Sequence, residues 1–140
     1  MLSFIQKRTI QLNGSILGFE ECNQFSIDVI EDNHEFAYLQ SLEQEHVSFL
    51  VVSPFSFHPD YSIELEEKDR KALNIETHED VVVLSIVTVS EPFPASTINL
   101  LAPVIFNIKN GQGKQIVLPP KYKYGTKEPL FEELHVESGE

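Results

Sequence analysis

Short apolar segments recur along this chain, and they limit its possible folds more than any other feature of the sequence. The longest, residues 81–89, is almost wholly apolar, which is typical of a central strand covered on both faces. Others alternate apolar and polar residues, as in residues 25–30, where Phe25, Ile27 and Val29 share one face. None approaches the roughly 18 residues needed to cross a bilayer, so we expect no membrane partner.

The pattern predicts six to eight short strands joined by turns. The segments that predict strands are 9–12, 25–30, 36–40, 47–52, 81–89, 104–108 and 114–118. Asn13-Gly14 follows the first of these segments as a type I′ turn signal, and residues 110–113 predict a hairpin between the last two. Such closely spaced strands favour an antiparallel arrangement.

Helix is expected in two places only. Residues 64–73 place Leu65, Ala72 and Leu73 on one side, with acids early and bases late, which suits the helix dipole. A second, shorter helix is expected around residues 127–135. The predicted fold is therefore mainly β, a small antiparallel β-barrel or curled sheet with one or two short helices. Residues 1–127 would form a single domain, and residues 128–140 an acidic C-terminal tail that is flexible or a short helix.

The chain of 140 residues is strongly acidic, with a formal net charge of -12. A surface of this sign repels phosphate backbones, so we expect no direct binding of nucleic acid. It would steer a basic protein toward the chain. The alternative is that the acidic surface serves only to keep the protein soluble. Five lysines and no acid lie between Lys109 and Lys127, and the following tail holds five glutamates.

No arrangement of residues predicts catalysis, a cofactor or a metal site. Cys22 is the single cysteine, so a disulfide within the chain and a thiolate cage are both impossible, and its acidic neighbours favour an inert thiol. The five histidines lack metal-binding spacing, and we expect them to be exposed. They are His34, His46, His58, His78 and His135. We expect a protein that is not an enzyme and that is cytoplasmic, because the N-terminus lacks the residue order of a secretory signal.

Aromatic residues stand out in two proline-containing segments that should be loops. Residues 53–61 hold two prolines and three aromatic residues, Phe55, Phe57 and Tyr61, and Phe93 lies between Pro92 and Pro94. Prolines stiffen a loop and reduce the entropy lost when a partner docks, and aromatic side chains are common anchors of protein–protein interfaces. The alternative is that these rings plug the ends of the barrel.

Several motifs along the chain are shared with a known family. They are Gly14–Glu20, Phe36–Ser41, Val47–Phe55, Pro59–Tyr61, Leu84–Pro92, Ser96–Asn107 and Gly113–Gln115. In this order they resemble the FliW flagellar assembly factor family from about residue 5 to residue 125. The block Asn99-Leu100-Leu101-Ala102-Pro103 with the downstream Gly113-Lys114-Gln115 is the most specific part. Ile98 departs from the smaller alanine expected there.

The resemblance implies a regulator that binds other proteins and does not catalyse. Its members bind CsrA, a small dimeric RNA-binding regulator, and relieve its block on flagellin translation. They also bind flagellin, and accumulated flagellin would displace CsrA. Such a switch needs only mutually exclusive binding. We expect this chain to act in the same way, as a monomer.

The candidate docking surface combines the stiff aromatic loops with their acidic neighbours. It consists of Phe55, Phe57, Asp60, Tyr61, Glu91 and Phe93, with Asn99 holding the neighbouring loop through side-chain hydrogen bonds. Two rival hypotheses stay open at this point. One is a small-molecule-binding β-barrel or an unrecognised hydrolase that uses the barrel mouth, and the other is an RNA-binding protein that uses the lysines of residues 109–127.

Overall fold

Strand β5 (Val81–Thr88) organises the sheet in the computed structural model, which describes residues 2–131. Its N-terminal half pairs with β7 (Val104–Asn107), and its C-terminal half pairs with β4 (Ser48–Val52) and β6 (Thr97–Ile98). Successive residues of β5 contribute to two separate apolar clusters, Val82 and Leu84 to one and Val83 and Val87 to the other. The prediction of a central strand is confirmed, but one face is incompletely covered, since Val81 and Val83 are only partly buried.

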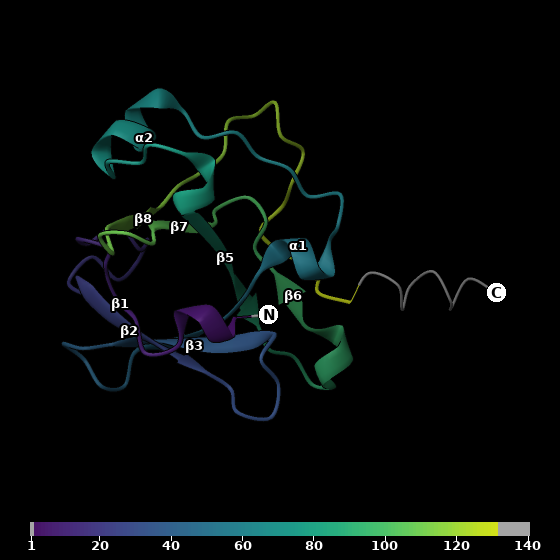
Figure 1. Cartoon of the computed structure of the whole chain (residues 1–140). Coiled ribbons are helices and arrows are strands. Elements are labelled where there is room, and N and C mark those ends of the chain that lie inside the picture. The colour runs from purple at the N-terminus through teal and green to yellow at the C-terminus, as the bar shows by residue number, and fades with distance from the viewer. Residues whose placement is uncertain (1, 132–140) are drawn as a thin grey trace.

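The remaining strands extend this sheet, and the helices lie in the connections between strands (Figure 1). They are β1 (Thr9–Gln11), β2 (Gln24–Val29), β3 (Phe36–Ser41), β8 (Gly113–Gln115), β9 (Glu128–Pro129), α1 (Pro54–Phe57), α2 (Glu67–Ala72) and the 3-10 turns Ser3–Ile5, His78–Asp80 and Phe93–Ala95. The strand order is β1-β2-β3-β4-β5-β6-β9, and β7 joins β5 to β8; all these pairings are antiparallel.

The sheet curls until β1 approaches β8, at the end of the branch that β7 begins, without forming a ladder with it. A single parallel bridge joins Gln11 of β1 to Gln112 beside β8, and the amide of Gln11 donates to the carbonyl oxygen of Gly111 at 2.8 Å. The fold is thus a mainly antiparallel curled sheet that is not closed, with two short α-helices. Of the two predicted forms, it is the curled sheet and not the barrel. Among the described residues, no helix has the length and apolar character to span a membrane.

Two apolar clusters stabilise the sheet, one on each side of β5. The first lies inside the curl and includes fully buried Phe25, Ile27, Leu39 and Phe106. The second lies between the sheet and the later connections, and includes Leu130. Burial of large side chains of this kind contributes about 1.5–3 kcal/mol each.

The helix predicted over residues 64–73 is shorter than expected. Leu65 precedes α2, Ala72 is exposed, and Leu73 is buried just beyond the last helical residue. The helix ends because Asn74 adopts a positive φ of 57°, and the Nδ2 atom of Asn107 donates to the carbonyl oxygens of Leu73 and Asn74 at 3.0 Å each. The local charge pattern predicts a longer helix than these tertiary contacts allow.

The prediction of a helix around residues 127–135 is wrong for residues 127–131, the part that the structure describes. Glu128 and Pro129 form β9, which pairs with β6, and Leu130 is completely buried. The packed unit therefore extends beyond the boundary expected at residue 127, and the rest of the predicted tail lies outside the described residues. The strand β6 and the helix α1 were not predicted, because each is too short to show a period.

The motif Gly113-Lys114-Gln115 has structural roles in β8. A Cβ atom on Gly113 would lie 2.5 Å from the carbonyl oxygen of Ile105, so only glycine fits between β7 and the core. Lys114 Nζ lies 2.9 Å from Oδ1 of the buried Asp69, which ties α2 to the sheet. Gln115 donates from Nε2 to the carbonyl oxygen of Ala102 at 3.0 Å.

Candidate functional site

Helix α1 separates the aromatic residues of the segment 53–61 into two groups. Phe57 lies with its ring centroid 5.5 Å from that of Phe36 and 5.9 Å from that of Phe131. Phe93, from the 3-10 turn Phe93–Ala95, lies 6.0 Å from Phe36 and 5.6 Å from Phe131. We call Phe36, Phe57, Phe93 and Phe131 the phenylalanine cluster. The structure thus brings together two of the predicted rings, Phe57 and Phe93, that are far apart in sequence.

The phenylalanine cluster reaches the surface mainly through one of its members. Phe93 is 42% exposed, whereas Phe36 is buried and Phe57 is partly buried. Glu91 is exposed and two residues away along the chain. The Oγ atom of Ser96 accepts a hydrogen bond from the amide of Ser90 at 2.9 Å and so holds the two ends of this loop together. An aromatic anchor beside a carboxylate is therefore presented on a constrained loop.

Phe55 is the other aromatic residue of α1, and it packs against a different ring. Its ring is 43% exposed and lies 5.6 Å from that of Tyr61, centroid to centroid. Asp60 is exposed nearby in the chain. The predicted surface is thus divided by α1 into a part around Phe93 and a part around Phe55.

Tyr61 lies in the interior, which corrects its assignment to an exposed docking surface. It is 4% exposed, and its hydroxyl donates to the carbonyl oxygen of Leu100 at 2.8 Å. Burial, together with the neighbouring Tyr124 and Tyr122 phenols, raises the pKa of the Tyr61 hydroxyl above its ordinary value. The phenol therefore stays protonated at neutral pH and acts as a buried hydrogen-bond donor.

Asn99 lies between β6 and the segment that leads to β7. Its Oδ1 atom accepts hydrogen bonds from the backbone amides of Leu101 and Ala102, at 3.1 and 2.9 Å. This is the side-chain turn geometry that asparagine favours. The contacts fix the path of the Asn-Leu-Leu-Ala-Pro block, and Asn99 itself is only partly buried.

The histidines do not share one environment. His34, His46 and His78 are exposed, as expected, but the prediction is wrong for His58, which is buried. Its Nε2 atom lies 2.7 Å from the carbonyl oxygen of Pro129, to which it donates, and so links the end of α1 to β9. His135 lies outside the described residues. Within residues 2–131, no group of three or more His, Cys, Asp or Glu side chains could hold a metal ion.

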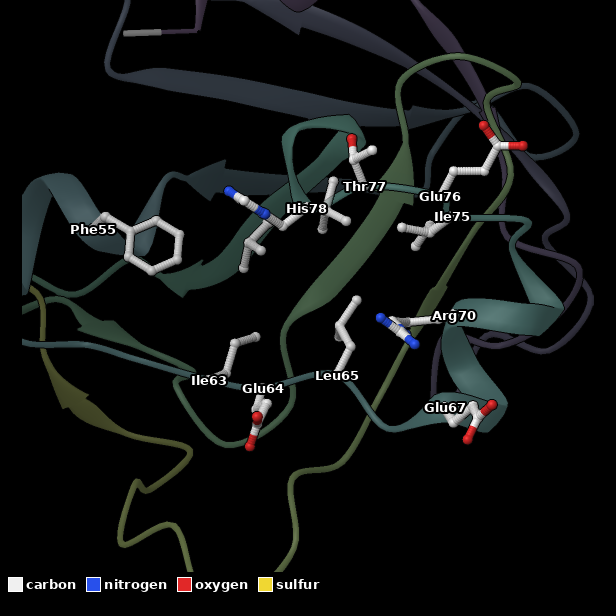
Figure 2. Close-up of a pocket in the computed structure, with 12 residues that line it drawn as sticks. Phe55, Ile63, Glu64, Leu65, Glu67, Arg70, Ile75, Glu76, Thr77 and His78 are labelled. Atoms are coloured by element: carbon white, nitrogen blue, oxygen red, sulfur yellow. The ribbon is translucent and has the colours of Figure 1, made fainter.

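A groove of about 590 Å³ lies beside α2, and sequence reasoning missed it (Figure 2). Its apolar lining consists of Phe55, Ile63, Leu65, Ile75, Val81 and Val83, and its polar lining of Glu64, Glu67, Arg70, Glu76, Thr77 and His78. We call it the α2 groove. The available signal is the presence of isolated aliphatic residues in the highly charged stretch 62–80, for which the sequence predicts only a helix over residues 64–73.

The α2 groove lies outside the curl of the sheet, whose interior is filled by the first apolar cluster. This filled interior counts against the rival hypothesis of a ligand site at a barrel mouth.

The fold and the exposed side chains together define a class of protein. It is a small, mainly antiparallel β protein in which one curled sheet carries exposed aromatic and acidic side chains on its short connections. Within that class the chain belongs to the FliW family, because the model of the family described as FliW protein matches residues 2–130.

Individual relatives agree with this assignment. The protein named flagellar assembly factor FliW of Clostridium botulinum (strain Okra / Type B1) is 40% identical over 94% of this chain and 92% of its own length. That of Bacillus subtilis (strain 168) is 42% identical over 89% of this chain and 87% of its own. A solved structure titled crystal structure of the flagellar assembly factor FliW matches with a TM-score of 0.82 and 34% identity, covering 89% of this chain and 86% of that one.

Proposed function

We propose that this chain is a cytoplasmic flagellar assembly factor that works by binding other proteins and not by catalysis. Its relatives carry the name flagellar assembly factor, which supports the role in assembly and favours a non-enzymatic one. The two partners we propose are a CsrA-type RNA-binding regulator and flagellin. Binding of one would exclude the other, so that free flagellin controls how much regulator is released.

The observation that carries this proposal is the phenylalanine cluster with its exposed member. Phe93 offers a partly exposed ring beside Glu91, on a loop that the Ser90–Ser96 contact holds in place. Interface hot spots are typically aromatic side chains held in well-packed surroundings, and little ordering entropy is lost when such a ring docks. The net charge of -12 complements the basic surface of a protein that binds RNA.

Mutually exclusive binding is sufficient for regulation. When flagellin accumulates it would occupy the chain, the regulator would be free to block flagellin translation, and secretion of flagellin would reverse the effect. The two affinities are linked, so each partner must weaken the binding of the other by the same factor.

The test is a calorimetric titration of the chain with purified CsrA, repeated after saturation with flagellin. We expect binding that flagellin abolishes. Phe93→Ala should weaken binding of at least one partner by about tenfold or more, as hot-spot truncations do. The matched control is Phe4→Ala, since Phe4 is 61% exposed and lies outside the phenylalanine cluster. Absence of binding to both partners would refute the proposed function.

A further inference from the structure

We propose that the α2 groove receives an amphipathic helix of a partner protein, with basic residues on both sides of the apolar stripe of that helix. The inference rests on the proposed function in one respect, since the partner is taken to be one of its two proteins. It adds the surface that is used and the chemistry of the segment that docks there.

The lining of the groove is apolar surface that the described residues leave partly open. Ile63, Leu65, Ile75, Val81 and Val83 pack against the second apolar cluster, yet each remains only partly buried. Contiguous apolar surface with a polar rim is typical of interaction sites. Covering it would add burial to side chains that are already ordered, so little further entropy would be lost.

The shape of the groove suits a helix. In Figure 2 the segment with Ile63 and Leu65 forms one side, and the segment with Ile75 and Thr77 forms the other. Phe55 lies at one end, and Arg70 of α2 lies toward the other. A helix laid along such a trough places its i, i+3, i+4 and i+7 side chains between the two sides, which is a common mode of peptide recognition.

The charge of the rim selects a basic helix. Glu64, Glu67 and Glu76 line the groove together with one arginine, Arg70, so the carboxylates exceed the guanidinium by two charges. Glu67 already lies 3.5 Å from the Nζ atom of Lys71. Glu64 and Glu76 make no ion pair with any residue of the described range 2–131, so they are available to lysine or arginine side chains of a partner.

Charge also argues against two other occupants. Residues 132–140 of this chain contain four glutamates and no lysine or arginine, so their sign is wrong for this rim. A second copy of the chain would carry the same net charge of -12, so the two copies would repel each other.

The groove is connected to the phenylalanine cluster through α1. Phe55 lines the groove and contacts Tyr61, whereas Phe57, two residues later, packs in the cluster. A helix seated against Phe55 would therefore press on the same short helix that holds Phe57. This shared element gives a physical route by which occupation of one surface would affect the other.

The first experiment compares two double charge reversals in the full chain. Glu64→Lys with Glu76→Lys changes the groove rim, and Glu21→Lys with Glu45→Lys changes two exposed acids away from it by the same total charge. We expect the groove variant to bind CsrA or flagellin about tenfold more weakly and the control variant to stay within about twofold, in calorimetry at low salt. Equal affinities of the two variants for both partners would overturn the proposal.

The second experiment observes the groove directly by NMR of methyl groups in the wild-type chain. The probe is a synthetic helical peptide with a leucine stripe flanked by lysines, and its control has glutamates in place of the lysines. We expect the lysine peptide alone to shift the methyl signals of Ile63, Leu65 and Ile75. Equal shifts with both peptides, or none, would overturn the proposal.

The methyl spectra also test the other occupants. A change of the groove signals on deletion of residues 132–140, or on dilution of the free chain, would show that the tail or a second copy fills the groove, and the proposal would fall. The peptide titration does not depend on CsrA or flagellin. If neither of them binds the wild-type chain, the proposed function fails while the groove is still tested.

Discussion

The hydroxyl of Tyr61 connects the segment after α1 to the segment after β6, through its hydrogen bond to Leu100. In Tyr61→Phe the buried carbonyl oxygen of Leu100 would lose this donor while the ring packing is kept. We expect the free energy of unfolding at neutral pH to fall by about 1 kcal/mol, measured by urea denaturation. A variant as stable as the wild type would show that another donor satisfies this carbonyl group.

The same phenol predicts a dependence of stability on alkaline pH. Its pKa is raised in the folded chain above the unfolded value of 10.0, so the folded state holds the proton more tightly. The stabilisation is fully present below the unfolded pKa and is lost as the pH rises from there through the folded pKa. We expect the free energy of unfolding to decrease above about pH 10, and to decrease less steeply in Tyr61→Phe. Parallel curves for the two proteins would contradict this assignment.

Asn99 offers a matched pair of substitutions at the residue scale. Asn99→Ala removes the acceptor for the amides of Leu101 and Ala102, and we expect a loss of about 1–2 kcal/mol in the free energy of unfolding. Asn99→Asp keeps an oxygen in the same position and should retain most of the stability. Equal losses in both variants would mean that the amide group, and not the Oδ1 acceptor, is what the loop needs.

At the scale of elements, β9 is only two residues long, yet its loss should matter. Leu130 follows it and is completely buried, its amide donates to the carbonyl oxygen of Ser96 at 3.0 Å, and His58 binds Pro129. We expect Leu130→Ala to cost about 2–5 kcal/mol, since it leaves a cavity in the second apolar cluster. The control Val117→Ala, at a side chain that is 59% exposed, should cost far less in the same denaturation experiment. Similar losses would show that the segment after residue 127 is not part of the packed unit.

The elements also show which parts of the structure could be predicted from sequence. The strands β2, β3, β4 and β5 were predicted to within one or two residues, because each has an alternating or continuous apolar pattern of five residues or more. Strands β6 and β9 are two residues long, and tertiary pairing creates them. The aromatic part of the candidate site could be located from proline and aromatic composition. The burial of Tyr61 and the α2 groove could not, because both depend on how distant segments pack.

At the scale of the whole molecule, the negative charge should act mainly on how fast a basic partner arrives. With a net charge of -12, the chain attracts cations over distances of about a Debye length, which is ~10 Å at 0.1 M salt. In the proposed complexes, apolar contacts around Phe93 and in the α2 groove would act only after the two surfaces meet, so they would govern dissociation. Charge and apolar contact therefore have separable kinetic effects.

This separation leads to a prediction for binding of CsrA. Between about 0.05 M and about 0.5 M salt we expect the association rate constant to fall by about tenfold or more, with a smaller change in the dissociation rate constant. Phe93→Ala should instead raise the dissociation rate constant and leave the salt dependence of the association rate constant unchanged. Stopped-flow kinetics on both proteins would check this. An association rate that does not respond to salt would mean that steering by net charge plays no part, and that the acidity of this chain serves only its solubility.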